Sequence, residues 1–144
     1  PLRRQRQMCI RDRLMYVVSK KHPMAKKKCM TIEDFRDENL LMFNVDSVQN
    51  ELLKNRFDQL KLNPRIIMRS SQLYTALKFI ENGSCGCFLF SDMLPHFKQY
   101  KGIPLEPPID VNIGIVWKKG NFLSHSAQLF IDFAMQYCSE NITT

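Results

Sequence analysis

Segments with a helical period alternate with strand-like segments along this chain, and this order narrows the possible folds most. The clearest helical period occupies residues 73–80, where apolar residues recur at i, i+3, i+4 and i+7: Leu73, Ala76, Leu77 and Ile80. Short apolar runs at 40–43 and 87–90 are typical of buried strands. Strands that alternate with helices favour right-handed crossovers and a mainly parallel sheet, so we expect an α/β fold.

The same patterns give boundaries for the other elements. We expect strands at 14–19, 40–43, 65–69, 87–90, 102–105 and 111–117, with the 66–68 run buried. We expect helices at 31–35, 48–60, 73–80 and from Ser124 onward, and one turn interrupted by Pro95. Thr31 is expected to cap the first of these helices, with Asp34 as its capping-box partner. Asp46 or Ser47 should cap the second helix, Ser70 and Ser71 should cap the third, and Gly83 should end the third.

Two stretches interrupt this regular order. Residues 1–13 have neither a helical nor a strand period, so we interpret them as a leader that is non-native or disordered. Prolines cluster in residues 104–108, and Lys118–Asn121 is expected to form a turn. The proline cluster is therefore the predicted hinge or boundary.

The distribution of charge argues against a nucleic-acid surface within this chain. The net charge is +7, but residues 1–28 hold ten Lys/Arg and one acid, whereas residues 29–144 hold eleven Lys/Arg and thirteen acids. Phosphate binding needs cations arrayed on a fixed face, and the body of the chain is almost neutral. The longest apolar runs are far shorter than the ~18 residues that suggest a membrane helix, so we expect no membrane span.

The sequence contains no pattern that predicts a metal site, a cofactor site or enzymatic activity. Five cysteines form an odd set without a secretory signal pattern before them, which predicts reduced thiols and a cytoplasmic location. Cys85 and Cys87 could bind a metal or sense oxidants, but no second pair has zinc spacing, so buried structural cysteines are the preferred interpretation. The three histidines are isolated, and no catalytic triad, carboxylate pair or phosphate-binding glycine loop is present. His22 is expected to belong to a turn.

Several segments resemble the C-terminal half of a LysR-type transcriptional regulator, within its effector-binding domain. Residues 14–25 are similar to that family's strand and His-Pro-Leu-Ala turn, and residues 31–35 and 40–43 to its next helix and strand. Residues 63–83 resemble its strand, polar turn and ligand-facing helix, and residues 113–133 its closing strand and helix. The family's Gly-x-Gly is replaced by Gly83-Ser84-Cys85, and its Leu-Pro by Phe90-Ser91.

The resemblance implies a fold like that of type 2 periplasmic binding proteins, with two α/β lobes around an effector cleft. Residues 24–106 would form the second lobe, residues 14–23 a crossover strand, and residues 107–144 the hinge and the return of strand and helix to an incomplete first lobe. It also implies a homo-oligomeric regulator that senses a small, often anionic effector. Such a regulator binds promoter DNA through an N-terminal helix-turn-helix that has no counterpart here.

Polar residues at the end of the 65–69 strand are the candidate ligand contacts. Ser70, Ser71 and Gln72 lie where a strand ends and a helix begins, and orphan N–H groups there favour an anion. Phe43 and Asn44 end the preceding strand and could form the opposite wall, although a core Phe and a loop Asn are the simpler interpretation. Ser71 could equally serve only as a helix cap.

A transporter's solute-binding protein shares the two-lobed fold and is the alternative function. It would require export, which five thiols without a secretory signal disfavour.

Overall fold

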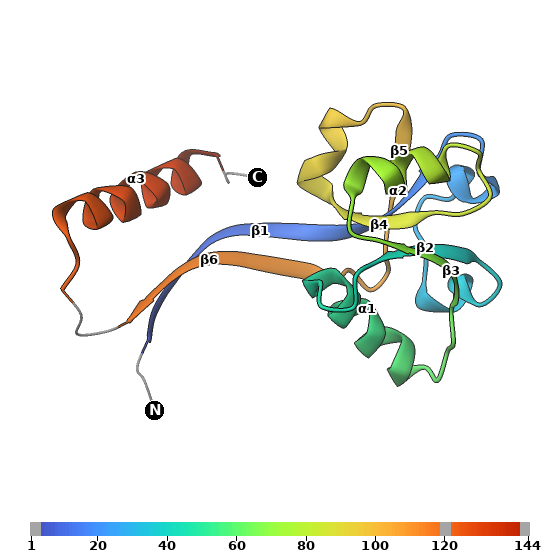
Figure 1. Ribbon diagram of the computed structural model, residues 1–144, viewed down its shortest axis with the longest axis horizontal. Coiled ribbons are helices and arrows are strands. Elements are labelled where there is room, and N and C mark those ends of the chain that lie inside the picture. The colour runs from blue at the N-terminus through green and yellow to red at the C-terminus, as the bar shows by residue number, and fades with distance from the viewer. Residues whose placement is uncertain (1–3, 119–121, 142–144) are drawn as a thin grey trace. The chain divides into compact units, whose positions relative to one another are not determined.

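The computed structural model describes residues 4–118 and 122–141 (Figure 1). Its strands are β1 (Arg4–Ser19), β2 (Asn39–Phe43), β3 (Arg65–Ser70), β4 (Cys87–Phe90), β5 (Tyr100–Pro104) and β6 (Asp110–Lys118). Its α-helices are α1 (Val48–Gln59), α2 (Leu73–Ile80) and α3 (His125–Asn141). Three short 3₁₀-helices complete the order: η1 (Pro23–Lys26), η2 (Ile32–Phe35) and η3 (Ser91–His96). The chain therefore has the alternating α/β order that its sequence predicts.

These elements form two compact units. One contains residues 13–109, and the other contains the described parts of residues 1–12 and 110–144. The second boundary lies next to the proline cluster at 104–108.

The larger unit is built on a mainly parallel sheet. β1 is antiparallel to β4 and β5, whereas β2 is parallel to β3. Backbone hydrogen bonds join the β2–β3 pair to the strands around β1. Leu41 N donates to Gly86 O at 2.8 Å, and Gly86 N donates to Asn39 O at 3.3 Å. The resulting order is β3-β2-β4-β1-β5, with β1 alone running against the other four.

The helices α1 and α2 cover opposite faces of this sheet (Figure 1). Successive residues of β2 point to opposite faces, so Leu40 and Met42 join one core cluster and Leu41 joins the other. The α1 cluster also contains Leu53 and Phe57. The α2 cluster contains the stripe read from the sequence, namely Ala76, Leu77 and Ile80, with Leu73 packed against it. The helical period of residues 73–80 is thus confirmed.

The helix ends agree with the sequence except at α2. Ser47 caps α1 by accepting from Asn50 N at 3.3 Å, and Gly83 ends the α2 region with a φ of +78°. The expected cap of α2 was wrong, because its N-cap is Gln72, which makes no side-chain capping bond. Ser70 and Ser71 lie before the cap, because the chain remains extended through Gln72 before it turns into the helix.

Two other expectations were wrong. Residues 66–68 do not form a buried strand: Ile66 is 37% exposed and Ile67 41% exposed, since β3 is the edge strand of the sheet. Residues 1–13 are not free of regular structure either, because β1 begins at Arg4. Whether those residues are native stays a prediction.

The smaller unit contains β6, its pairing with β1, and α3. Ser124 caps α3 as expected, since its Oγ accepts from Ala127 N at 3.2 Å. Ile131 and Cys138 of α3 are buried, whereas Phe130 is 63% exposed. The turn expected at 118–121 lies mostly outside the described residues.

Candidate ligand site

The carboxyl ends of β2 and β3 bring the predicted ligand residues together. The two strands are parallel, and their register pairs Phe43 with Ser70 at their last positions. Asn44 and Ser71 therefore leave the sheet at the same edge, and Gln72 follows at the start of α2. Outside the carboxyl ends of parallel strands is where ligands bind in open α/β sheets, so the predicted residues form one candidate site.

The turn between β3 and α2 is held by Ser70. Its Oγ accepts from Gln72 N at 3.1 Å and donates to Gln72 O at 3.2 Å. Thr75 Oγ1 donates to Gln72 Oε1 at 2.9 Å, which leaves the Gln72 side-chain amide nitrogen for another partner. Ser71 is exposed and its hydroxyl has no hydrogen-bond partner among the described residues. Ser71 is thus the hydroxyl most available to a ligand.

The N-terminus of α2 favours a negative charge. No side chain caps its first turn and no acidic residue lies within that turn. The orphan N–H groups and the positive end of the helix dipole consequently face this edge without a charged competitor.

Phe43 and Asn44 have unequal roles at this edge. The Phe43 side chain is half-buried and packs with the α2 cluster, as a core residue would. Asn44 is exposed, and its main-chain oxygen accepts from Ser47 N at 3.0 Å and from Ser47 Oγ at 2.8 Å. Its side-chain amide makes no hydrogen bond to the described residues, so it remains available to a ligand.

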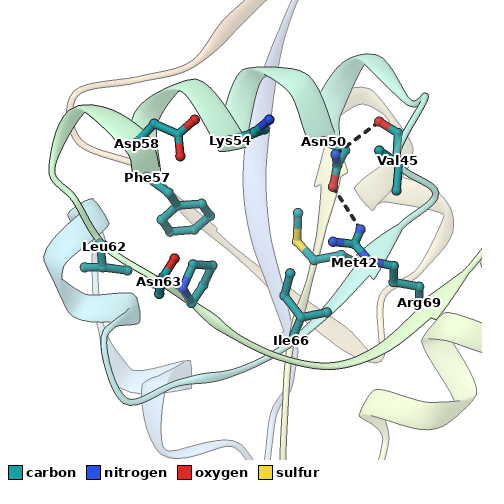
Figure 2. Close-up of a pocket in the computed structure, with 11 residues that line it drawn as sticks. Met42, Val45, Asn50, Lys54, Phe57, Asp58, Leu62, Asn63, Ile66 and Arg69 are labelled. Atoms are coloured by element: carbon teal, nitrogen blue, oxygen red, sulfur yellow. Dashed lines mark hydrogen bonds between the residues drawn. The ribbon is translucent and has the colours of Figure 1, made fainter.

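Two residues that sequence analysis missed hold this edge from the other face of the sheet. Arg69 Nη1 donates to Phe43 O at 3.2 Å and to Asn50 Oδ1 at 3.1 Å. Asn50 is only 6% exposed, and its Nδ2 donates to Val45 O at 3.1 Å (Figure 2). We call these contacts the Arg69–Asn50 clasp. Its sequence signal was the arginine that follows the apolar residues of β3, directly before the two serines.

The buried polar cluster of the larger unit lies at the opposite edge. Tyr16 Oη donates to Glu38 Oε2 at 3.3 Å, and His22 Nε2 lies 3.5 Å from the same oxygen. Burial raises the pKa of Tyr16 and lowers the pKa of His22, while the Glu38 charge opposes the lowering at His22. Glu38 precedes β2, so the cluster is at the amino end of that strand. His22 belongs to the η1 turn as expected, accepting from Met24 N at 3.2 Å.

Two of the three cysteines of the larger unit lie in its core, and Cys29 is exposed. Cys85 and Cys87 are fully buried, and burial raises the pKa of Cys87 to about 12, which suppresses thiolate formation. The described residues include no group of three His, Cys, Asp or Glu side chains placed to hold a metal ion. Within the same residues, no helix is both long and apolar enough to cross a membrane.

The sequence of this chain matches a known family of protein domains. The family model for the LysR substrate binding domain matches residues 4–139. The uncharacterised HTH-type transcriptional regulator YybE of Bacillus subtilis (strain 168) is 25% identical over 131 residues, which are 90% of this chain and 44% of YybE. The transcriptional dual regulator GltC of the same organism is 26% identical over 135 residues, with the same two shares. The chain spans less than half the length of these relatives.

Solved structures show the same fold. The regulatory domain of Synechocystis PCC6803 CcmR, in complex with 2-PG, has a TM-score of 0.87 at 19% identity, covering 99% of this chain and 70% of that one. The effector-binding domain of QuiR, in complex with shikimate, has a TM-score of 0.81 at 20% identity, covering 97% and 68%. Both likenesses concern the fold.

Proposed function

The chain belongs to the LysR substrate-binding domain family, and on that premise we propose that it senses a small anionic effector for a DNA-binding transcription regulator. Its fold is the type 2 periplasmic-binding-protein-like fold of LysR effector-binding domains. The observation that carries the proposal is the register of Phe43 with Ser70. This register gathers the five predicted residues at one edge, beside a helix N-terminus without a side-chain cap.

The proposed contacts divide by chemistry. The Ser71 hydroxyl and the Gln72 amide, together with the first N–H groups of α2, would hold a carboxylate or phosphate. Ser70 would shape the turn, and Phe43 and Asn44 would form the opposite wall. Shikimate and 2-phosphoglycolate, named with two proteins of the same fold, are both anions and support this charge preference.

The wider roles of the intact protein follow from the family. We propose a cytoplasmic homo-oligomer that contacts promoter DNA through an N-terminal helix-turn-helix outside this chain. The curated relatives are transcription regulators, which favours this role over that of a transporter's solute-binding protein. We assign no catalytic residue and no cofactor.

Titration calorimetry of the intact protein tests the site. The probes are small carboxylates and phosphates, with shikimate and 2-phosphoglycolate among them. We expect at least one anion to bind, and Ser71→Ala to weaken its binding about tenfold through loss of a charge-assisted hydrogen bond. Ser84→Ala, which removes an exposed hydroxyl bonded to Asn82 beyond the other end of α2, is the matched control. If the affinity for the bound anion is the same in Ser70→Ala, Ser71→Ala, Gln72→Ala and the parent, the proposed site is wrong.

A further inference from the structure

A pocket of about 340 Å³ lies between α1 and β3, on the face of the sheet opposite α2 (Figure 2). Its lining is apolar toward the core, where Met42, Phe57 and Leu62 are all nearly fully buried. Ile66 of β3 also lines it and is 37% exposed. Cavities of about 300–1,000 Å³ with apolar walls and a few polar groups are typical of small-molecule sites.

The polar groups of this pocket give it a net positive charge. Arg69 and Lys54 line it together with one acid, Asp58. The Arg69–Asn50 clasp uses only Nη1 of the guanidinium, and Lys54 Nζ has no partner among the described residues. A guanidinium has five N–H donors in a planar fork that matches a carboxylate. The pocket can therefore offer a charge-assisted pair of bonds beside an apolar surface.

We propose that the pocket between α1 and β3 is a second ligand site, which takes a small carboxylate with an aromatic or branched apolar body. The carboxylate lies against Arg69 with Lys54 near it, and the apolar body covers Met42, Phe57 and Ile66. Asp58 disfavours a second negative charge on the ligand, so a monocarboxylate fits better than a phosphate. The side chains that line the pocket select this chemistry through charge complementarity and available volume.

This site is separate from the edge that carries Ser71, yet one residue links the two. Arg69 and Ser70 are consecutive in β3, so their side chains point to opposite faces of the sheet. Through the clasp, Arg69 binds the main-chain oxygen of Phe43, a wall residue of the proposed effector site. A carboxylate held by Arg69 would thus act on the position of the loop that follows Phe43, without occupying the edge itself.

Phenylacetate is the probe, and methyl NMR of the intact protein is the readout. We expect phenylacetate to shift the methyl signals of Met42, Leu62 and Ile66, and to leave those of Leu73 and Leu77 unchanged. The neutral analogue phenylacetamide should bind about tenfold more weakly, because it cannot form the charge-assisted pair. Shifts confined to the α2 side, or equal affinity for the two compounds, would overturn the proposal.

Paired variants assign the binding to this pocket. Arg69→Met should weaken phenylacetate binding about tenfold, whereas Arg65→Met on the same strand, which does not line the pocket, should leave it unchanged. Lys54→Met removes a charge without touching the clasp, and it should also weaken phenylacetate binding. It remains informative even if Arg69→Met alters the folded spectrum. Unchanged affinity in both Arg69→Met and Lys54→Met would contradict the site.

A second pair separates a ligand site from an interface between copies of the chain. Ile66→Glu should abolish phenylacetate binding, whereas Ile67→Glu, equally exposed but outside the pocket, should preserve it. Light scattering should give the same mass for both variants and the parent. If both variants instead lower the mass while the parent binds no phenylacetate, a second copy covers this face and the proposal is wrong. The effector edge is tested independently of this pocket, by the effect of Ser71→Ala on anion binding. Failure of one proposal therefore leaves the other standing.

Discussion

The ring of Tyr16 occupies the space that a side chain at Gly86 would need. A Cβ placed on Gly86 would lie 2.4 Å from Tyr16 Cζ and 2.6 Å from its Oη. Tyr16 is fully buried and its ring makes edge contacts with Phe35, at a centroid distance of 4.9 Å. Tyr16 and Gly86 are 70 positions apart in the chain. Gly86 also makes the backbone hydrogen bonds that join β2 to β4.

Gly86→Ala should therefore destabilise the larger unit by about 1–3 kcal/mol, the usual cost of overpacking a core. Chemical denaturation followed by tyrosine fluorescence measures the change. Gly102→Ala is the control, because its Cβ would meet mainly the flexible end of Leu94, which can move aside. Equal losses in the two variants would show that the Tyr16 ring is not the obstacle.

Stability should fall as the pH drops below about 6.5, the ordinary pKa of histidine. Burial lowers the pKa of His22 in the folded chain, so the unfolded chain binds more protons between the two pKa values. The contribution of neutral His22 is present above the unfolded pKa and is lost as the pH falls through that range.

Thermal melts at pH 7.5 and 5.5 would detect this loss. His22→Asn keeps an acceptor for Met24 N but cannot gain the proton, and should reduce the difference between the two melting temperatures. A variant with the parent's full pH dependence would assign the effect to other groups.

Ser71→Ala should change effector affinity and not stability. Its hydroxyl caps no helix and bonds to no described residue, so the free energy of unfolding should stay within about 0.5 kcal/mol of the parent. Ser47→Ala, which removes the real cap of α1, should cost about 1 kcal/mol in the same denaturation experiment. A Ser71→Ala loss as large as that of Ser47→Ala would restore the capping role.

Deleting residues 1–13 should expose β6. The strand β1 begins at Arg4 and pairs with β6, and Arg11 forms an ion pair with Asp110. Hydrogen exchange read by mass spectrometry should become faster across 110–118, while 40–43 and 87–90 keep their protection. Unchanged exchange in β6 would indicate that the leader contributes nothing, as its sequence alone suggests.

Local sequence was sufficient for most elements because their signals are local. The stripe from Leu73 to Ile80 predicts α2, and Ser47 and Ser124 predict the starts of α1 and α3. Each of these signals depends on residues within a few positions, whose spacing alone fixes which side chains share a face. The candidate edge was predictable for the same reason, since a polar turn after a strand and before a helix is a short-range pattern.

Tertiary structure decided what depends on distant partners. Ile66 and Ile67 read as buried, but their exposure is set by the place of β3 at the sheet's edge, which no local pattern records. The Arg69–Asn50 clasp likewise joins residues 19 positions apart. Ser71 matches a cap in sequence, yet the chain turns into the helix one residue later. Spacing along the chain encodes the elements, whereas pairing between them selects which faces are covered and which polar groups remain for a ligand.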